Sequence, residues 1–251
     1  MGLLGKVAIV TGASQGVGRG IALALAREGA ATAVLARRYD KLVEVVKEIE
    51  EAGGQGLAVE CNVRFRDQVD KAVAATVYEF GGIDILVHAA RGDLQILPLD
   101  EETDDHFIME WETGPLAEMR LMQACFPYLK TNGGKIIIVS SSAGPRGLAR
   151  GGAYSTAKEA MRSLTRVAAR EWGRYKINVN CICPFANSPA WVAWWDQDRE
   201  QAQQALATVA MGRVGDCERD IGRAVVFLAG PDSDYITGET IMVDGGEMML
   251  H

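Results

Sequence analysis

The segment SSSAGPRGLARGGAYSTAK, residues 140–158, holds three side chains that together can move a proton. Tyr154 and Lys158 are four residues apart, so on a helix they share one face and the ammonium group favours the ionised phenol. Ser141 lies at the carboxyl end of the strand-like run KIIIVS, where its hydroxyl can hold a substrate oxygen. Tyr154 would then give a proton to that oxygen or take one from it.

A second segment, TGASQGVG, residues 11–18, has the glycines of a phosphate-binding turn. Glycines let the chain turn tightly and let a pyrophosphate approach backbone N–H groups at a helix N-terminus. An ordinary strand-to-helix turn uses the same residues, so the glycines alone do not distinguish the two interpretations. The nucleotide contacts expected in this turn are Gly12, Ser14, Gln15, Gly16, Val17 and Gly18.

Two arginines follow the second strand-like run. Arg37 and Arg38 stand in VLARRYD, where an acidic residue would bind the ribose hydroxyls of NAD. A guanidinium group instead pairs with a 2′-phosphate, so the sequence favours NADP(H) over NAD(H), through Arg37 first and also Arg38. The alternative is a solvated turn in which Asp40 neutralises one of them.

The elements that must position these groups alternate along the chain. Helical patterns separate the short runs KVAIV, ATAVLA, GLAVEC, IDILVH, GKIIIVSS, INVNCIC and ETIMVDGG. This order predicts an α/β fold with a doubly wound parallel sheet of the Rossmann type, covered by helices on both faces. No linker interrupts the chain, so residues 1–251 are predicted to form a single domain. Two longer segments, Pro115 to Lys130 and Gly151 to Tyr175, are predicted to be amphipathic helices that pack on the sheet or on a partner subunit.

Composition argues against several kinds of partner. The chain has 26 basic and 33 acidic residues, a net charge of −7, and no basic cluster, so nucleic acid is not expected. No secretory leader and no apolar run near the ~20 residues that span a bilayer are present, so we expect a cytoplasmic protein without membrane contact. The five cysteines, Cys181 and Cys183 included, lie in mostly apolar contexts and predict neither a disulfide framework nor a metal site.

The glycine turn, the spacing from Ser141 to YSTAK and the terminal YITGETIMVDGG together resemble the classical short-chain dehydrogenase/reductases over nearly the whole chain. The resemblance implies interconversion of a ketone and a secondary alcohol with bound NAD(P), with Ser141, Tyr154 and Lys158 as the catalytic residues. Lys158 would also contact the nicotinamide ribose. A homo-oligomer is implied as well, expected as a tetramer that pairs through the two long helices.

Four positions depart from the family pattern. The strand end that the family fills with NNAG reads HAAR, residues 88–91, and the family's catalytic Asn, which shapes the proton relay, falls on Gly114. Asn62 stands where the family has an Asp toward adenine, and Pro184 is followed by Phe instead of Gly. The resemblance places a further set of residues beside the cofactor, namely Asn62, Val63, Ala89, Ala90, Tyr154, Lys158 and Pro184.

Arg91 and His88 end the altered strand. Arg91 is interpreted either as a clamp for a cofactor phosphate or substrate carboxylate, or as a loop cation paired with Asp93. His88 is interpreted as a buried sheet residue rather than as a catalyst.

The family carries its substrate-covering segment at about residues 187–212, and here SPAWVAWWDQD places Trp191, Trp194 and Trp195 at helical spacing. The cluster is expected to line an apolar pocket for a bulky or ring-containing substrate, with Trp191 and Trp195 in contact with it. Packing on the body of the protein is the alternative for any one tryptophan.

Three functions are compatible with these residues. The leading hypothesis is an NADP(H)-dependent oxidoreductase that acts on a small-molecule ketone or secondary alcohol. A lyase or isomerase could use Tyr154 and Lys158 for proton transfer without net redox chemistry. A nucleotide-binding regulatory or scaffold protein is the third, because the changes at NNAG and at Gly114 permit a loss of turnover.

Overall fold

One parallel sheet organises the protein, whose computed structural model describes residues 2–92 and 95–250. Its strands are β1 (Val7–Thr11), β2 (Ala31–Ala36), β3 (Gly56–Glu60), β4 (Ile85–His88), β5 (Gly134–Val139), β6 (Ile177–Pro184) and β7 (Thr240–Val243). They lie in the order β3-β2-β1-β4-β5-β6-β7, with every pair parallel. The winding direction reverses between β1 and β4, which is where doubly wound sheets bind ligands at the carboxyl ends of their strands. The predicted α/β fold is confirmed.

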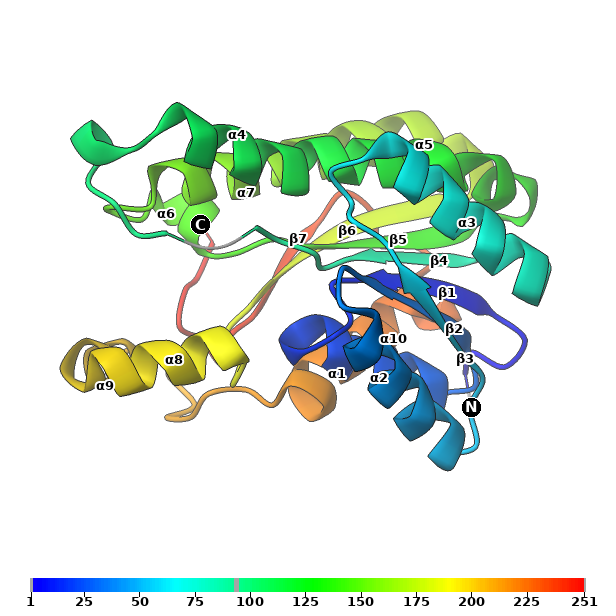
Figure 1. Ribbon diagram of the computed structural model, residues 1–251, viewed down its shortest axis with the longest axis horizontal. Helices are drawn as coiled ribbons and strands as arrows, with labels where there is room; N and C mark the ends of the chain where they lie inside the picture. Colours follow the sequence, from blue (N-terminus) through cyan, green and yellow to red (C-terminus); the bar gives the residue numbers. More distant parts are fainter. Residues whose placement is uncertain (1, 93–94, 251) are drawn as a thin grey trace.

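Helices cover both faces of the sheet (Figure 1). One layer holds α1 (Gly16–Arg27), α2 (Tyr39–Glu51) and α10 (Arg223–Ala229), and the other holds α3 (Arg66–Phe80), α5 (Pro115–Asn132) and α7 (Gly152–Trp172). The remaining helices are α4 (Asp104–Thr113), α6 (Ala143–Arg146), α8 (Pro189–Gln197) and α9 (Arg199–Ala207). Four short turns complete the description, η1 (Leu99–Glu101), η2 (Gly173–Tyr175), η3 (Cys217–Gly222) and η4 (Pro231–Ser233).

Strand β1 shows why the central strands are apolar throughout. All five of its residues are buried, because helices press on it from both sides. Val10 joins the core with Ile21 and Leu25 of α1, whereas Ile9 joins the opposite core with Leu121 of α5. The two-residue period of a strand thus divides its side chains between two hydrophobic cores.

The two predicted long helices are present with small changes at their ends. α5 extends two residues beyond the predicted end, to Asn132, and α7 ends at Trp172, where η2 continues to Tyr175. Helix α4, which the sequence analysis did not predict, runs directly into α5 through Gly114.

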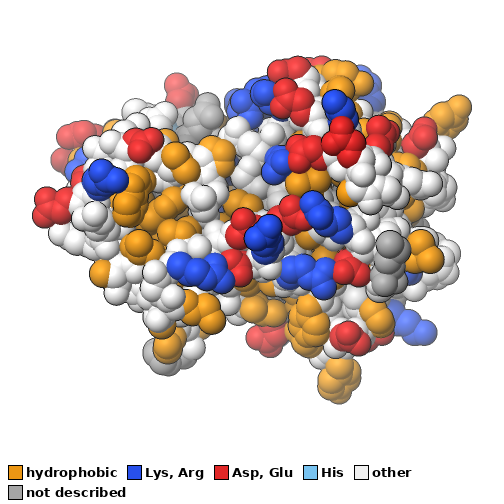
Figure 2. Space-filling view, turned by 90° about the horizontal axis from the view of Figure 1, so that it is seen from below, with side chains coloured by type: hydrophobic (Ala, Val, Ile, Leu, Met, Phe, Trp, Pro, Cys, Tyr) orange, Lys and Arg blue, Asp and Glu red, His pale blue; other side chains and the backbone are white. Residues whose placement is uncertain are grey.

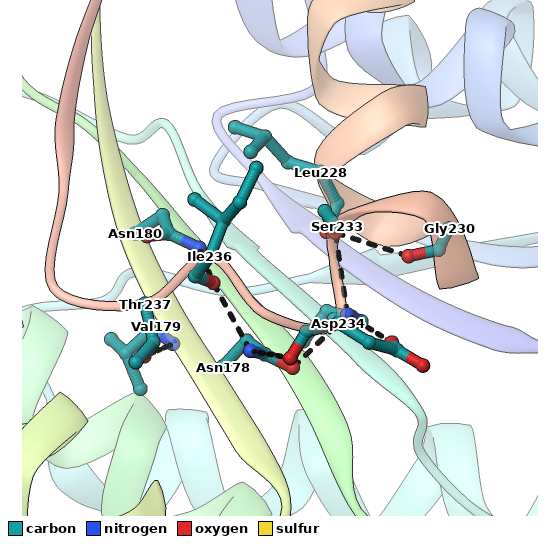
Figure 3. A network of polar contacts seen from close by, with 10 residues as sticks. Asn178, Val179, Asn180, Leu228, Gly230, Ser233, Asp234, Ile236 and Thr237 are labelled. Carbon is teal, nitrogen blue, oxygen red and sulfur yellow. Dashed lines mark hydrogen bonds and ion pairs between the residues drawn. The ribbon is translucent and has the colours of Figure 1, made fainter.

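A polar network holds the last strand against β6 (Figure 3). The Asn180 side chain is 1% exposed, donates to the Ile236 carbonyl at 2.9 Å and accepts from the Glu239 N–H at 3.1 Å. Asn178 donates to the carbonyl groups of Asp234 and Ile236, both at 3.0 Å. These bonds fix the segment before β7, and therefore the course of the chain toward the active-site edge.

Charges on the α1, α2 and α10 side are intermingled, as Figure 2 shows in a view from below Figure 1. Arg27 pairs with Glu218 at 2.6 Å, and Arg223 pairs with Glu28 at 2.5 Å. The charges on this face therefore balance locally. Within the described ranges, no helix combines the length and the apolar character that crossing a membrane requires.

Candidate active site

Ser141, Tyr154 and Lys158 meet at the carboxyl edge of the sheet. Ser141 directly follows the end of β5, and Tyr154 and Lys158 occupy the first two turns of α7, which packs beside α6. The Lys158 Nζ atom lies 5.6 Å from the centre of the Tyr154 ring. The Ser141 hydroxyl is half-buried and accepts the Ala143 N–H at 3.2 Å.

Lys158 is held at both its main chain and its side chain. Its Nζ atom donates to the Val139 carbonyl at 2.9 Å, and its own carbonyl accepts the Ser140 hydroxyl at 2.8 Å. The side chain is buried, so its charge acts on neighbouring groups through little intervening water. A fixed positive charge therefore lies beside the phenol of Tyr154.

The glycine turn has the shape that a pyrophosphate needs. Gly12 has a φ of +67°, and a Cβ atom there would lie 2.8 Å from the Ala89 carbonyl. At Gly18 a Cβ atom would lie 2.4 Å from the Gly12 carbonyl oxygen. The N-cap residue of α1, Gln15, makes no side-chain capping bond, so the first N–H groups of the helix are available to an anion. The turn therefore fits the dinucleotide predicted from the sequence.

Arg38 is the arginine that reaches this turn. Its Nη2 atom donates to Gln15 Oε1 at 2.7 Å and lies 3.4 Å from Ser14 Oγ. Arg37 is exposed at the start of the same loop. Arg38 therefore contacts the glycine turn directly.

Other predicted cofactor residues line the same edge. The N–H groups of Ala89 and Ala90 donate to Thr11 Oγ1 at 3.1 and 3.2 Å, which ties the ends of β4 and β1 together. Asn62 follows β3, and its Oδ1 atom accepts the Arg64 N–H at 3.2 Å. The remaining two are Val63, which is buried after β3, and Pro184, which is half-buried at the end of β6.

Arg91 is exposed just beyond β4, at the edge that carries Ser141, Tyr154 and Lys158. Its predicted alternative partner, Asp93, lies outside the described residues. Both interpretations of Arg91 therefore remain predictions.

The tryptophans of α8 form one cluster. The Trp191 ring lies 4.8 Å from Phe185, 5.3 Å from Trp194 and 6.0 Å from Trp195, measured between ring centres. All three tryptophans are half-buried. α8 begins next to the glycine turn, because a Cβ atom on Gly16 would lie 3.1 Å from the Pro189 side chain. In Figure 1, α8 and α9 extend beyond the carboxyl ends of the strands, below the sheet. An apolar aromatic surface therefore adjoins the catalytic edge.

His88 has a defined hydrogen-bonding state. Thr11 Oγ1 already accepts two N–H groups, so it donates its hydrogen to His88 Nδ1, 2.9 Å away. The ring hydrogen is consequently on Nε2, which faces the carbonyls of Thr113 and Gly114 without reaching hydrogen-bond geometry with them. Burial and then the charge of Lys158 lower the pKa of His88 to about 3. The ring is therefore neutral.

Glu118 is a buried acidic residue near Lys158 that the sequence analysis did not single out. Its side chain is fully buried, and neither carboxyl oxygen has a hydrogen-bond partner within the described part of the chain. Burial raises the pKa of Glu118 well above its usual range, and the charge of Lys158 offsets part of that rise. A sequence signal existed, because Glu118 falls on the apolar stripe that Leu121, Cys125 and Leu129 continue.

Metal ligands were neither predicted nor found in the described residues, where no three His, Cys, Asp or Glu side chains are grouped to hold an ion. All five cysteines carry free thiols.

A doubly wound sheet with a glycine turn after β1, and with Ser, Tyr and Lys at its carboxyl edge, defines a class of nicotinamide-dependent oxidoreductases. Residues 12–247 match the family model described as enoyl-(acyl carrier protein) reductase. The chain belongs to the short-chain dehydrogenase/reductase family, which confirms the resemblance noted in the sequence.

Relatives and solved structures agree with this assignment. The chain is 40% identical to a 12alpha-hydroxysteroid dehydrogenase of a Clostridium species, over 96% of each chain. It is 38% identical to a short-chain reductase of Streptomyces niveus, over 96% of this chain and 93% of the relative. A putative short-chain alcohol dehydrogenase from Sinorhizobium meliloti superposes with a TM-score of 0.93 at 33% identity, covering 98% of this chain and 97% of that one. Levodione reductase superposes with a TM-score of 0.92 at 25% identity and covers 98% of each chain.

Proposed function

We propose that this protein is an NADP(H)-dependent oxidoreductase that interconverts a bulky ketone and the corresponding secondary alcohol. The central observation is the junction of Ser141, Tyr154 and Lys158 at one sheet edge, beside a glycine turn that fits a dinucleotide. Nicotinamide cofactors supply or accept a hydride. The residues of the chain must therefore bind the substrate oxygen and transfer its proton.

Each catalytic residue has one task in ketone reduction. The Ser141 hydroxyl donates a hydrogen bond that orients the substrate oxygen. The Tyr154 phenol gives its proton to that oxygen as the carbonyl carbon becomes an alcohol carbon. Lys158, 5.6 Å from the ring centre, stabilises the negative charge that remains on the phenol.

The NADP(H) preference rests on charge at the end of β2. Arg38 reaches across the glycine turn to Gln15 and Ser14, and Arg37 adds a second positive charge. A 2′-phosphate in that place would receive charge-assisted hydrogen bonds that NAD(H) cannot use. No acidic side chain precedes the arginines in VLARR to bind the ribose hydroxyls.

The substrate class rests on the aromatic cluster of α8. Half-buried tryptophans beside the catalytic edge suit a ring system, and residues 187–212 are proposed to cover it. The relative named a hydroxysteroid dehydrogenase supports a substrate of steroid size, and the similarity to levodione reductase supports a cyclic ketone. Arg91 is proposed to attract an acidic group on such a substrate.

The test is a panel of cyclic ketones and alcohols, from one ring to a carboxylated steroid, assayed with the purified protein and NADPH or NADH. The proposal expects NADPH absorbance to fall as a multi-ring ketone is consumed and the alcohol appears in equal amount. Product formed without a change in NADPH absorbance would indicate the lyase or isomerase alternative. Cofactor binding without turnover of any ketone or alcohol would favour the scaffold alternative. The cytoplasmic location and the lack of nucleic-acid and membrane partners stay predictions of the sequence.

A further inference from the structure

Gly114 is a meeting point of ionisable groups from three elements. His88 at the end of β4 directs Nε2 toward the Thr113–Gly114 carbonyls, and Glu118 follows one turn along α5. Lys158 of α7 is close enough for its charge to act on both His88 and Glu118. Of these groups, the reaction described above uses Lys158 alone.

Glu118 lies one helical turn after Gly114 on α5. The Glu118 N–H donates to the Gly114 carbonyl at 2.9 Å, so the two residues lie on the same face of the helix, one turn apart. Side chains on an α-helix tilt toward its N-terminus, and Gly114, one turn before Glu118, has no side chain of its own on that face. The side-chain atoms nearest to a Cβ atom on Gly114 would be Met161 Sδ at 3.4 Å and the Ala157 Cβ at 3.6 Å, so the junction also contacts α7.

The Glu118 carboxyl has hydrogen-bonding capacity that no group among the described residues uses. It is fully buried, and neither oxygen has a partner in the described chain. Burial raises the pKa of Glu118 and so favours its protonated form, which has one O–H to donate. Buried polar groups of this kind are normally satisfied by bound water.

We propose that Glu118 is a positioning and proton-relay residue for Lys158, in place of the side chain that Gly114 lacks. The proposal rests on the oxidoreductase function proposed above. The carboxyl group, with water between it and Lys158, connects the catalytic lysine to the helix junction at Gly114. His88, neutral and hydrogen-bonded to Thr11, borders the same junction without exchanging protons itself.

One proton passes along the relay for each ketone that is reduced. Tyr154 loses its phenolic proton to the substrate oxygen, and the Lys158 ammonium returns a proton to the phenolate. Glu118 then protonates the Lys158 amine and becomes a carboxylate beside an ammonium, which is a favourable pair in a buried site. Solvent water finally reprotonates Glu118, so one solvent proton enters for each proton that leaves in the alcohol.

Single-turnover kinetics of Glu118→Gln test this role directly. The first ketone reduction uses the proton already on Tyr154, so we expect it to proceed at the wild-type rate. Later turnovers need the relay, and we expect them to be about tenfold slower or more, with a larger solvent deuterium effect and little change in KM. Glu118→Asp, which keeps a titratable carboxyl, should recover part of the steady-state rate.

Glu110→Gln is the matched control. Glu110 is also buried in the neighbouring helix α4, but its carboxyl faces His106 at 3.9 Å. This variant should show equal rates in the first and later turnovers. If Glu118→Gln also turned over repeatedly at the wild-type rate, with an unchanged pH profile, the relay inference would be wrong.

Infrared spectroscopy supplies a readout that needs neither cofactor nor activity. The ligand-free wild-type protein should show the C=O band of a buried protonated carboxyl at neutral pH, and Glu118→Gln should lack that component. If the difference spectrum between the wild type and Glu118→Gln lacked this C=O band, the assignment of Glu118 as a protonated acid would be overturned. Should Glu118→Gln fail to fold, Glu118→Leu, which also removes the titratable carboxyl, gives the same kinetic comparison. If the wild-type protein reduced no ketone, the proposed function would be refuted instead. Failure of the relay inference and failure of the proposed function therefore give different results.

Discussion

At the residue scale, His88 shows how burial decides protonation. The folded protein holds its pKa at about 3, first by burial and second by the charge of Lys158, whereas 6.5 is the ordinary value. Between these values the unfolded chain binds a proton that the folded protein excludes. The stability that this neutral ring contributes is therefore present above pH 6.5 and is lost as the pH falls from 6.5 toward 3.

Replacing His88 by Asn should remove this pH dependence, because Asn does not titrate. We expect the free energy of unfolding of the wild type to fall more steeply between pH 6.5 and 4 than that of His88→Asn. The difference should approach about 1.4 kcal/mol for each pH unit. Urea denaturation at several pH values measures the free energy of unfolding of both proteins. If it changed equally with pH in the wild type and in His88→Asn, the buried neutral state of His88 would be contradicted.

Cofactor choice is also decided by single residues. Arg38→Asp removes the guanidinium that reaches Gln15 and Ser14 and adds a negative charge near the expected 2′-phosphate. We expect the Kd for NADPH to rise at least about tenfold, with a much smaller change for NADH. Fluorescence titration measures both constants, and Arg37→Asp shows whether the neighbouring charge contributes. Equal weakening of the two cofactors would refute the NADP(H) preference.

At the scale of elements, the strands and the two long helices follow from local patterns, since β-branched runs and apolar steps of three and four appear in the chain itself. The junction of α4 and α5 does not follow from such local patterns. The apolar stripe of α5 indicates that Glu118 faces inward, but only tertiary packing brings it close to Lys158 of α7. The tautomer of His88 likewise depends on Thr11, which is 77 residues away and adjacent only once β1 and β4 pair.

The α4–α5 junction predicts the outcome of restoring an Asn side chain. A Cβ atom at position 114 would lie 2.9 Å from the Glu110 carbonyl oxygen, so the helix junction must shift to accept one. We expect Gly114→Asn to lower the free energy of unfolding by about 1–3 kcal/mol and to reduce turnover. Gly82→Asn is the control, because a Cβ atom at Gly82 meets nothing within 4 Å. Faster turnover with unchanged stability would mean that the native relay is merely impaired.

At the scale of the whole molecule, apolar side chains remain exposed on α4 and on α7, and α7 is one of the two long helices that the family resemblance places in subunit contacts. Their exposed fractions are 39% for Phe107, 51% for Ile108, 44% for Trp111 and 47% for Val167. Large exposed apolar side chains on α4 and α7 suit an interface between protein surfaces. We therefore predict a homo-oligomer, expected to be a tetramer.

Sedimentation velocity at micromolar concentration tests the assembly. The wild type should sediment as a tetramer, and the double variant Trp111→Glu and Val167→Glu should shift toward smaller species, because two like charges would then face their symmetry mates. Tyr78→Glu, which alters a 91% exposed side chain on α3, serves as the control and should leave the mass unchanged. A wild-type monomer would contradict the prediction.

The most direct measurement compares Tyr154→Phe with the wild type in two assays on the same samples, NADPH binding and NADPH consumption with the ketone found in the panel. The substitution removes the phenolic hydroxyl and keeps the ring beside Lys158, so we expect NADPH affinity to stay within about twofold of the wild type. Ketone-dependent NADPH consumption should fall by about 10²-fold or more, as the loss of a general acid predicts. Consumption at a near-native rate in Tyr154→Phe would contradict the proton transfer on which the proposed oxidoreductase function depends.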